Sequence, residues 1–155
     1  MPQNLAPSCT TEKNVNLQNS IAIRRVLLLD AKFMLPSAGV LGHGLDAFMN
    51  VTCMAGHEMH NSLLQAFVEF GWLGGILFSA LIVTGLWSIV RAAKGDVASR
   101  FVLCCLTFAV LLCLAHGRLS REPALFAWLG AVAGLTQSAR TRAPVAQPAK
   151  PLVSS

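Results

Sequence analysis

Apolar residues dominate the second half of the chain, whereas polar residues are concentrated near its two ends. Residues 67–90 contain a single charged residue, Glu69, close to the start of the run. A helix rises about 1.5 Å per residue, so roughly 20 apolar residues cross the hydrocarbon core of a bilayer. The run is long enough, and it predicts a membrane-spanning helix over about residues 64–90.

Two shorter apolar runs follow and predict two further crossings. Residues 101–115 carry no charge but reach a comfortable spanning length only with the next two residues, which places the second helix at about 101–117. The third is expected at about 123–139, with Pro123 in the first helical turn, where proline is tolerated. The predicted fold is therefore all-α: a polytopic membrane protein with about three transmembrane helices.

The remaining residues form three segments of different character. Residues 1–20 are polar and are expected to be disordered. Residues 21–61 are mixed: an amphipathic helix is predicted over 21–35, followed by a glycine-rich loop. Residues 140–155 form a basic tail rich in Pro and Ala, which is also expected to be disordered.

Composition agrees with a membrane protein and argues against a nucleic-acid binder. The chain is 54% hydrophobic and 12% charged, whereas about 25% of residues are charged in an average globular protein. The net charge of +5 would by itself suggest nucleic acid as a partner. The twelve basic residues are spread along the chain, however, and tyrosine is absent. They are better explained as topology signals, and no nucleic-acid partner is expected.

The basic residues also predict an orientation. Three lie between the first and second crossings and three in the tail, whereas two lie between the second and third crossings. The positive-inside rule then places the tail in the cytoplasm and residues 1–61 outside. No signal peptide or apolar helix precedes these outward residues. We therefore interpret the chain as the C-terminal part of a larger membrane protein.

The five cysteines show no CxxC spacing, so a zinc ribbon is not expected. Three of them lie within the apolar run 101–115, where a free cysteine behaves as a small hydrophobic residue. Cys9 and Cys53 would pair only if both faced an oxidising compartment, and we expect them to be unpaired.

The sequence HEMH (residues 57–60) stands directly before the first crossing. The zincin signature HExxH places its histidines four positions apart, on one face of a helix. Here the spacing is three and no third ligand is evident, so no metal is expected. His57 is interpreted as a loop residue, and a histidine-based metal carrier remains an alternative.

A more specific spacing begins at His60. His60 and Asn61 are followed by nine residues, then Gly71, then two residues and Gly74. This pattern resembles the signature of the bacterial O-antigen ligases. That signature is a histidine followed by Asn, Ser or Gln, nine residues, a glycine, two residues and a small residue.

Two upstream elements resemble the same family and occur in the same order. Arg24 and Leu28 resemble its Arg-x3-Leu element, and GHGLDAF (residues 42–48) resembles the GxGxxxF turn that precedes the catalytic loop. Arg25 and Leu29 also satisfy the first pattern, so the register of the arginine stays open. The distance from Arg24 to the turn suits the family's spacing better.

The resemblance covers about residues 21–90 and identifies 21–139 as a ligase-like membrane region. It implies a multi-pass glycosyltransferase of the bacterial inner (cytoplasmic) membrane that needs no metal ion or other cofactor. The donor would be a glycan on undecaprenyl diphosphate, and the acceptor lipid A-core or another glycan. Membrane lipids are the remaining expected partners. The family has about ten or more crossings, so we expect the chain to be truncated, and whether it is an active enzyme by itself stays open.

The resemblance also assigns roles to individual residues. Family arginines bind the diphosphate, and the family histidine serves the acceptor hydroxyl. Chemistry agrees, since a guanidinium pairs with two phosphate oxygens and a histidine can take a proton near neutral pH. The candidate catalytic residues are His60 and Arg24. The candidate substrate-binding residues are Arg25, Asn61 and Glu69, with Asn61 orienting the imidazole.

Plainer interpretations stand beside these. Arg24 and Arg25 also suit the polar face of an interfacial helix on anionic lipid heads. Glu69 is either a functional intramembrane carboxylate or an interfacial acid whose side chain reaches water. Gly71, Gly74 and Gly75 are interpreted as positions where a neighbouring helix approaches closely. For the whole chain, the alternatives are a polysaccharide polymerase of the same superfamily and a non-catalytic membrane protein or inactive fragment.

Overall fold

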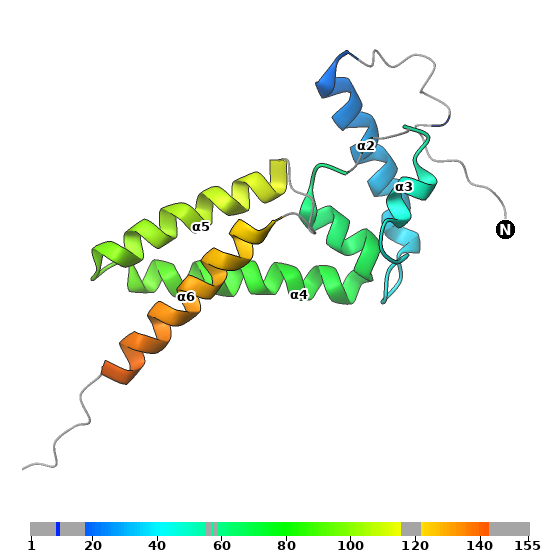
Figure 1. The fold of residues 1–155 in the computed structure, drawn as a ribbon. Helices are drawn as coiled ribbons and strands as arrows, with labels where there is room; N and C mark the ends of the chain where they lie inside the picture. Colours follow the sequence, from blue (N-terminus) through cyan, green and yellow to red (C-terminus); the bar gives the residue numbers. More distant parts are fainter. Residues whose placement is uncertain (1–8, 10–17, 55–56, 58, 116–121, 143–155) are drawn as a thin grey trace, which may run out of the picture.

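Helices are the only regular elements in the part of the chain that the computed structural model describes, which is residues 9, 18–54, 57, 59–115 and 122–142. The elements are α2 (Ser20–Met34), the short 3-10 helix η2 (Leu35–Ser37), α3 (Ala47–Val51), α4 (Ser62–Ala92), α5 (Val97–Ala115) and α6 (Pro123–Arg142). In Figure 1, α2 and α3 lie beside the start of α4, and the rest of α4 extends away from them with α5 and α6. The all-α prediction is confirmed for the described residues.

The two segments expected to be disordered lie mostly outside the described residues. Within residues 1–20 the structure describes Cys9 and 18–20, and within 140–155 it describes 140–142. These last three residues are helical, because α6 continues to Arg142. The predicted boundary of the tail was therefore too early.

The amphipathic helix predicted over residues 21–35 is confirmed as α2. Asn19 is the N-cap of this helix. Its side-chain oxygen accepts hydrogen bonds from the backbone N–H groups of Ile21 and Ala22, at 3.1 and 3.2 Å. Such a cap satisfies donors that have no partner within the helix. The helix ends at Met34 and the chain continues directly into η2, where Pro36 has no backbone N–H to extend the α-helical hydrogen bonds.

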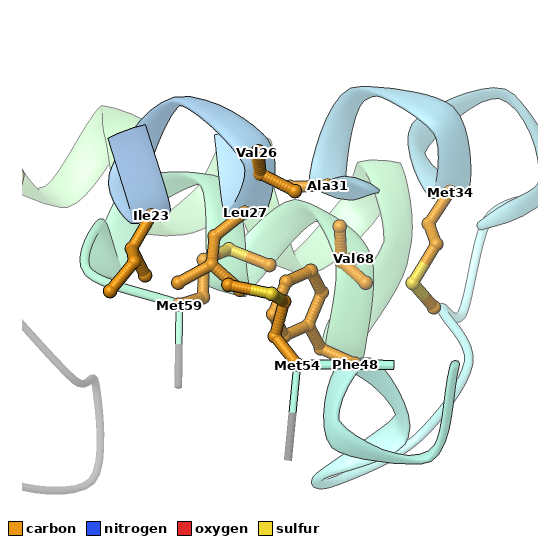
Figure 2. Packing of buried hydrophobic residues seen from close by; sticks show 9 residues of the cluster. All are labelled: Ile23, Val26, Leu27, Ala31, Met34, Phe48, Met54, Met59 and Val68. Atoms are coloured by element: carbon orange, nitrogen blue, oxygen red, sulfur yellow. The ribbon is translucent and has the colours of Figure 1, made fainter. Parts of the chain in front are cut away.

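The buried face of α2 packs into a first hydrophobic core, shown in Figure 2. We call it the N-terminal core, and its buried members are Ile23, Val26, Leu27, Ala31, Met34, Phe48, Met54, Met59 and Val68. They come from α2, α3, the segment before α4 and the first turns of α4. Burial of Met59 ties the segment that carries His60 to α2.

α4 is not a single straight helix. At Gly71 the backbone adopts φ +70° and ψ −170°, which divides the element into residues 62–70 and 72–92. The second part has 21 residues, enough to span roughly 30 Å. The predicted first crossing at 64–90 therefore corresponds to two helical pieces, and only the second has the length of a crossing. The apolar pattern did not reveal the break because it continues through Gly71.

The glycine-rich loop packs into this break. Four backbone hydrogen bonds join loop and helix: His43 N–H to Val68 O (3.0 Å), Gly44 N–H to Glu69 O (3.0 Å), Trp72 N–H to Gly39 O (2.9 Å) and Leu73 N–H to Val40 O (3.2 Å). The break leaves backbone donors and acceptors of α4 without intrahelical partners, and the loop supplies them. Loop and break are therefore one structural unit.

Gly42 and Gly71 form the closest approach in this unit. Both have positive φ, +80° and +70°, and a Cβ atom on either one would overlap the backbone of the other. The interpretation of Gly71 as a contact with a neighbouring helix is therefore wrong, because its neighbour is a loop. At Gly74 and Gly75 the atoms nearest to an added Cβ belong to the same helix, from Phe70 and Phe67 respectively.

α4 and α5 are long and apolar enough to cross a membrane. α6 is also 20 residues long, but its last turns are polar, and it does not pass the same criterion. The predicted second crossing at 101–117 corresponds to α5, and the third, at 123–139, corresponds to α6. Two candidate crossings are therefore found among the described residues, and the third stays a prediction.

The second hydrophobic core joins these three helices. Its buried members are Ile82, Ile89, Val102, Leu106, Ala109, Cys113, Leu125 and Val132. Each of the three helices contacts the other two, and in Figure 1 α6 crosses α4. α6 is therefore an integral part of this bundle.

Asp96 caps the first turn of α5. One of its carboxylate oxygens accepts hydrogen bonds from the backbone N–H and the hydroxyl of Ser99, at 2.9 and 3.0 Å. These bonds, led by the one from the Ser99 backbone, hold the pKa of Asp96 below its usual value. The cap therefore favours the folded state most when this carboxyl is ionised.

We predict that Asp96→Ala lowers the melting temperature of the protein in detergent at pH 7. Because the pKa of Asp96 is lowered on folding, its contribution is complete above the ordinary carboxyl pKa of about 3.9 and disappears as the pH falls through the lowered value. Thermal unfolding of both proteins between pH 7 and 3 measures the difference. A difference that widened on acidification would contradict the assignment of the cap.

Cys9 and Cys53 form a disulfide, with their Cα atoms 4.9 Å apart. The prediction that they are unpaired is wrong. They lie 44 positions apart, and only the folded chain brings them together. Beside this bond, Thr52 donates a 2.9 Å hydrogen bond from its hydroxyl to the buried carboxylate of Asp30 in α2. The other three cysteines, Cys104, Cys105 and Cys113, are free, as expected.

Loss of this disulfide should destabilise the N-terminal core. We expect Cys9→Ser with Cys53→Ser to lower the free energy of unfolding by about 2–4 kcal/mol, because a loop of this length restricts the unfolded chain. Thermal unfolding with and without a reductant tests this, and the double variant should not respond to the reductant. An equal response in the variant would place the redox-sensitive group elsewhere.

Candidate functional site

Arg24 and His60 line the same cavity. Its volume is about 200 Å³, and the residues around it are Arg24, Leu27, Leu28, Met59, His60, Asn61, Leu64, Leu114 and Ala115. These residues come from α2, from the start of α4 and from the end of α5. Three of the five residues predicted from the sequence, Arg24, His60 and Asn61, therefore meet here. We call this space the Arg24–His60 cavity.

α2 determines which of its two arginines reaches the cavity. Successive residues of a helix point about 100° apart, so adjacent side chains leave it in different directions. Arg24 lies one turn before Leu28, and both line the cavity. Arg25 is exposed and does not line it. The sequence left open whether Arg24 or Arg25 matches the Arg-x3-Leu element. Their side chains leave α2 in different directions, and of the two it is Arg24 that lines the cavity.

The N-terminus of α4 holds His60 at the cavity. Asn61 caps the helix: its backbone is extended, and its side-chain oxygen accepts a 2.9 Å hydrogen bond from the backbone N–H of Leu64. On the other side of His60, Met59 is buried in the N-terminal core. His60 itself is exposed. The two fixed neighbours therefore present an accessible imidazole at the start of a helix.

A second, largely apolar cavity adjoins the first. Its volume is about 340 Å³, and it is lined by Leu28, Lys32, Leu35, Asn61, Leu63, Leu64, Phe67 and Trp72. Leu28, Asn61 and Leu64 belong to both cavities. Both lie between α2 and the first part of α4, and we call them together the α2–α4 groove. Its polar end is at His60, and its apolar end reaches Trp72, where the crossing-length part of α4 begins.

Glu69 lies apart from this groove. Its side chain is 4% exposed, and one carboxylate oxygen accepts a 3.0 Å hydrogen bond from the amide of Gln65. Its backbone oxygen accepts from Gly44 of the glycine-rich loop. The side chain does not reach water, as an interfacial acid would. In the structure Glu69 supports the packing of the loop and does not line either cavity.

Lys32 was not selected from the sequence, although its spacing contains a usable signal. Arg24, Leu28 and Lys32 are separated by steps of four, and side chains with this spacing follow one side of a helix. All three line the groove. The exposed ammonium of Lys32 therefore adds a second basic group on the wall formed by α2.

Chemically, the groove combines positive charge at one end with an apolar floor at the other. The guanidinium of Arg24 and the partial positive charge at the N-terminus of α4 both favour an anion. His60 can exchange a proton beside that anion. Among the described residues no three His, Cys, Asp or Glu side chains are grouped as metal ligands, and Glu58 of the HEMH segment lies outside them.

Comparison of the chain with protein-family models, with curated proteins and with solved structures gave no match. Fold and site therefore define the class of protein. In its described residues it is an all-α protein with two helices long and apolar enough to cross a membrane, and with an arginine- and histidine-lined groove next to the first of them.

Proposed function

We propose that this chain bears the active site of a membrane glycosyltransferase that moves a glycan from undecaprenyl diphosphate to an acceptor hydroxyl, as O-antigen ligases do. One observation carries the proposal: Arg24 and His60, 36 positions apart in the sequence, line one cavity of about 200 Å³. These are the two residues that the resemblance assigns to the diphosphate and to the acceptor.

Arg24 would bind the diphosphate of the donor. A guanidinium presents paired N–H groups that match two phosphate oxygens, and it keeps its charge at any physiological pH. The N-terminus of α4 lies across the same cavity and adds a partial positive charge. Negative charge grows on the diphosphate as it leaves, so both groups stabilise the transition state more than the bound donor.

His60 would act on the acceptor. The acceptor oxygen forms a bond to the anomeric carbon of the glycan while the bond from that carbon to the diphosphate oxygen breaks. The diphosphate keeps the electron pair of the broken bond, and the imidazole takes the proton of the hydroxyl. The accessible position of His60 leaves room for a hydroxyl beside it. No step in this sequence requires a metal ion.

The apolar end of the α2–α4 groove suits the hydrocarbon chain of the same donor. Leu28, Leu63 and Phe67 line it, and it ends at Trp72, where the long part of α4 starts. Lys32 lines the second cavity, one helical turn beyond the shared residue Leu28, and offers a second cation to the donor. A polyprenyl diphosphate has this same sequence of chemistry, an anion followed by an apolar chain.

In this proposal α4 from residue 72, α5 and α6 cross the bacterial inner membrane, and the N-terminal core lies outside. The disulfide between Cys9 and Cys53 supports the outward position of the N-terminal core, because such bonds persist in oxidising compartments. Trp72 and Trp87 stand near the two ends of the long part of α4, as interfacial aromatic residues do. Arg91 lies over the Trp87 ring at 4.5 Å, at the end assigned to the cytoplasm.

Complementation tests the proposal. The complete gene that contains this sequence is expressed in bacteria that lack glycan ligation, and surface glycan is detected by gel electrophoresis. Restored ligation to lipid A-core supports a ligase. Restored chain length without ligation, in a strain that lacks the polymerase, would assign the polymerase reaction. No rescue in either strain, despite the protein being present in the membrane, would contradict glycan transfer.

A further inference from the structure

The loop between η2 and α3 exposes large apolar side chains at its tip. Val40 is 65% exposed, Leu41 79% and Leu45 73%. Between Lys32 and Asp46 the sequence contains no Asp, Glu, Lys or Arg. Water is an unfavourable environment for such a tip, because the transfer of apolar surface out of water is favourable.

Several backbone groups of this loop are paired within the protein: the N–H groups of residues 42–44 and the carbonyls of Gly39, Val40 and Gly44 have backbone partners. Gly42 N–H donates to Ala38 O at 2.9 Å, and the four backbone bonds to the break in α4 engage the loop on both sides of Gly42. The ring of His43 lies 3.1 Å from the hydroxyl of Ser37 and 3.3 Å from the backbone oxygen of Met34. Backbone polar groups need such partners in an apolar phase, and these bonds hold the loop at the break in α4.

The loop lies level with the start of the crossing-length part of α4. Its Gly39 and Val40 carbonyls accept from the N–H groups of Trp72 and Leu73, the first two residues after the break. Trp72 and Leu73 are themselves exposed, at 45% and 50%. The apolar tip is thus continuous with the apolar outer surface of α4.

We propose that residues 39–45 enter the outer edge of the lipid bilayer beside α4 and anchor the N-terminal core to it. The occupant of this surface is lipid: a tip that contains no Asp, Glu, Lys or Arg and exposes three large apolar side chains continues the apolar surface of α4. The proposal rests on the membrane placement of α4 given above. It adds that the groove, which ends at Trp72, opens at the level of the lipid surface.

Nitroxide labels in reconstituted protein test the depth of the loop. The chain is prepared in bilayers of phosphatidylcholine and phosphatidylglycerol with its three free cysteines replaced by alanine, and single cysteines are introduced for labelling. Leu41→Cys reports on the tip. Leu81→Cys, exposed on α4, is the reference for lipid, and Asn50→Cys, exposed on α3, is the reference for water. Collisions with oxygen indicate lipid, and collisions with a water-soluble nickel complex indicate solvent.

The expected result is a ratio of oxygen to nickel collisions at Leu41→Cys that is several-fold above that at Asn50→Cys and close to that at Leu81→Cys. A ratio at Leu41→Cys equal to that at Asn50→Cys, with Leu81→Cys in lipid, overturns the insertion of the loop and leaves the membrane placement standing. Few collisions with either reagent at Leu41→Cys would show that protein covers the tip, and this also overturns the proposal. A ratio at Leu81→Cys typical of water would overturn the membrane placement and the insertion together.

Discussion

Replacement of His60 by alanine lowers the rate of glycan transfer by about 10²–10⁴-fold, the range that a general base contributes. The effect falls on the chemical step, because the imidazole takes the proton of the acceptor while Arg24 still binds the donor. The side chain is exposed and is not part of either hydrophobic core, so the variant folds. The rate is measured in membranes with a lipid-linked glycan donor and an acceptor.

Two matched controls lie within the same segments. His57→Ala removes a histidine three positions earlier that does not line the cavity, and we expect its rate to change little. Arg24→Ala should abolish transfer, whereas Arg25→Ala, on the neighbouring position of α2, should be mild. An active His60→Ala protein beside an inactive His57→Ala protein would refute the site.

Gly71→Ala lowers the free energy of unfolding by about 3 kcal/mol or more, a loss outside the range of ordinary surface substitutions. Two causes add together. The positive φ of +70° is unfavourable for alanine, and the new methyl group would overlap the backbone of Val40 and Gly42. The overlap involves backbone atoms, which cannot rotate away. Unfolding of the purified protein by increasing denaturing detergent measures the loss.

Gly39→Ala is the matched control for this experiment. Gly39 also has a positive φ, +60°, but a Cβ atom there would have nothing within 4 Å. The substitution should therefore cost only the conformational strain, about 1 kcal/mol. Equal losses at both positions would mean that the loop does not pack into the break in α4.

Helix positions were largely predictable from the sequence. The expected helix over residues 21–35 is α2 at Ser20–Met34, because an apolar face repeats along it and Asn19 and Pro36 mark its ends. Length and hydropathy likewise located α4 and α5. These properties depend on residues near one another in the chain, so they can be read without the fold.

The break in α4 was harder to predict from the sequence. The motif placed a glycine at residue 71, but glycines inside apolar helices also occur where another helix packs closely, and the pattern does not distinguish the two. The positive φ of Gly71 and the hydrogen bonds from the loop decide the matter. Both depend on a loop about 30 positions away in the sequence, and hydropathy contains no information about that contact.

For the site, too, some features depend on local sequence and others on contacts between distant segments. The sequence by itself determined the all-helical character of the described chain, its two most apolar helices and the residue types that suit an anion and a proton transfer, because composition, periodicity and spacing are local properties. Only the tertiary structure decided that Arg24 rather than Arg25 lines the same cavity as His60. It also decided that Glu69 lies outside this cavity and that Cys9 forms a disulfide with Cys53. The direction of each arginine follows from how α2 is rotated against the N-terminal core, and that rotation is set by the packing of side chains from four separate segments.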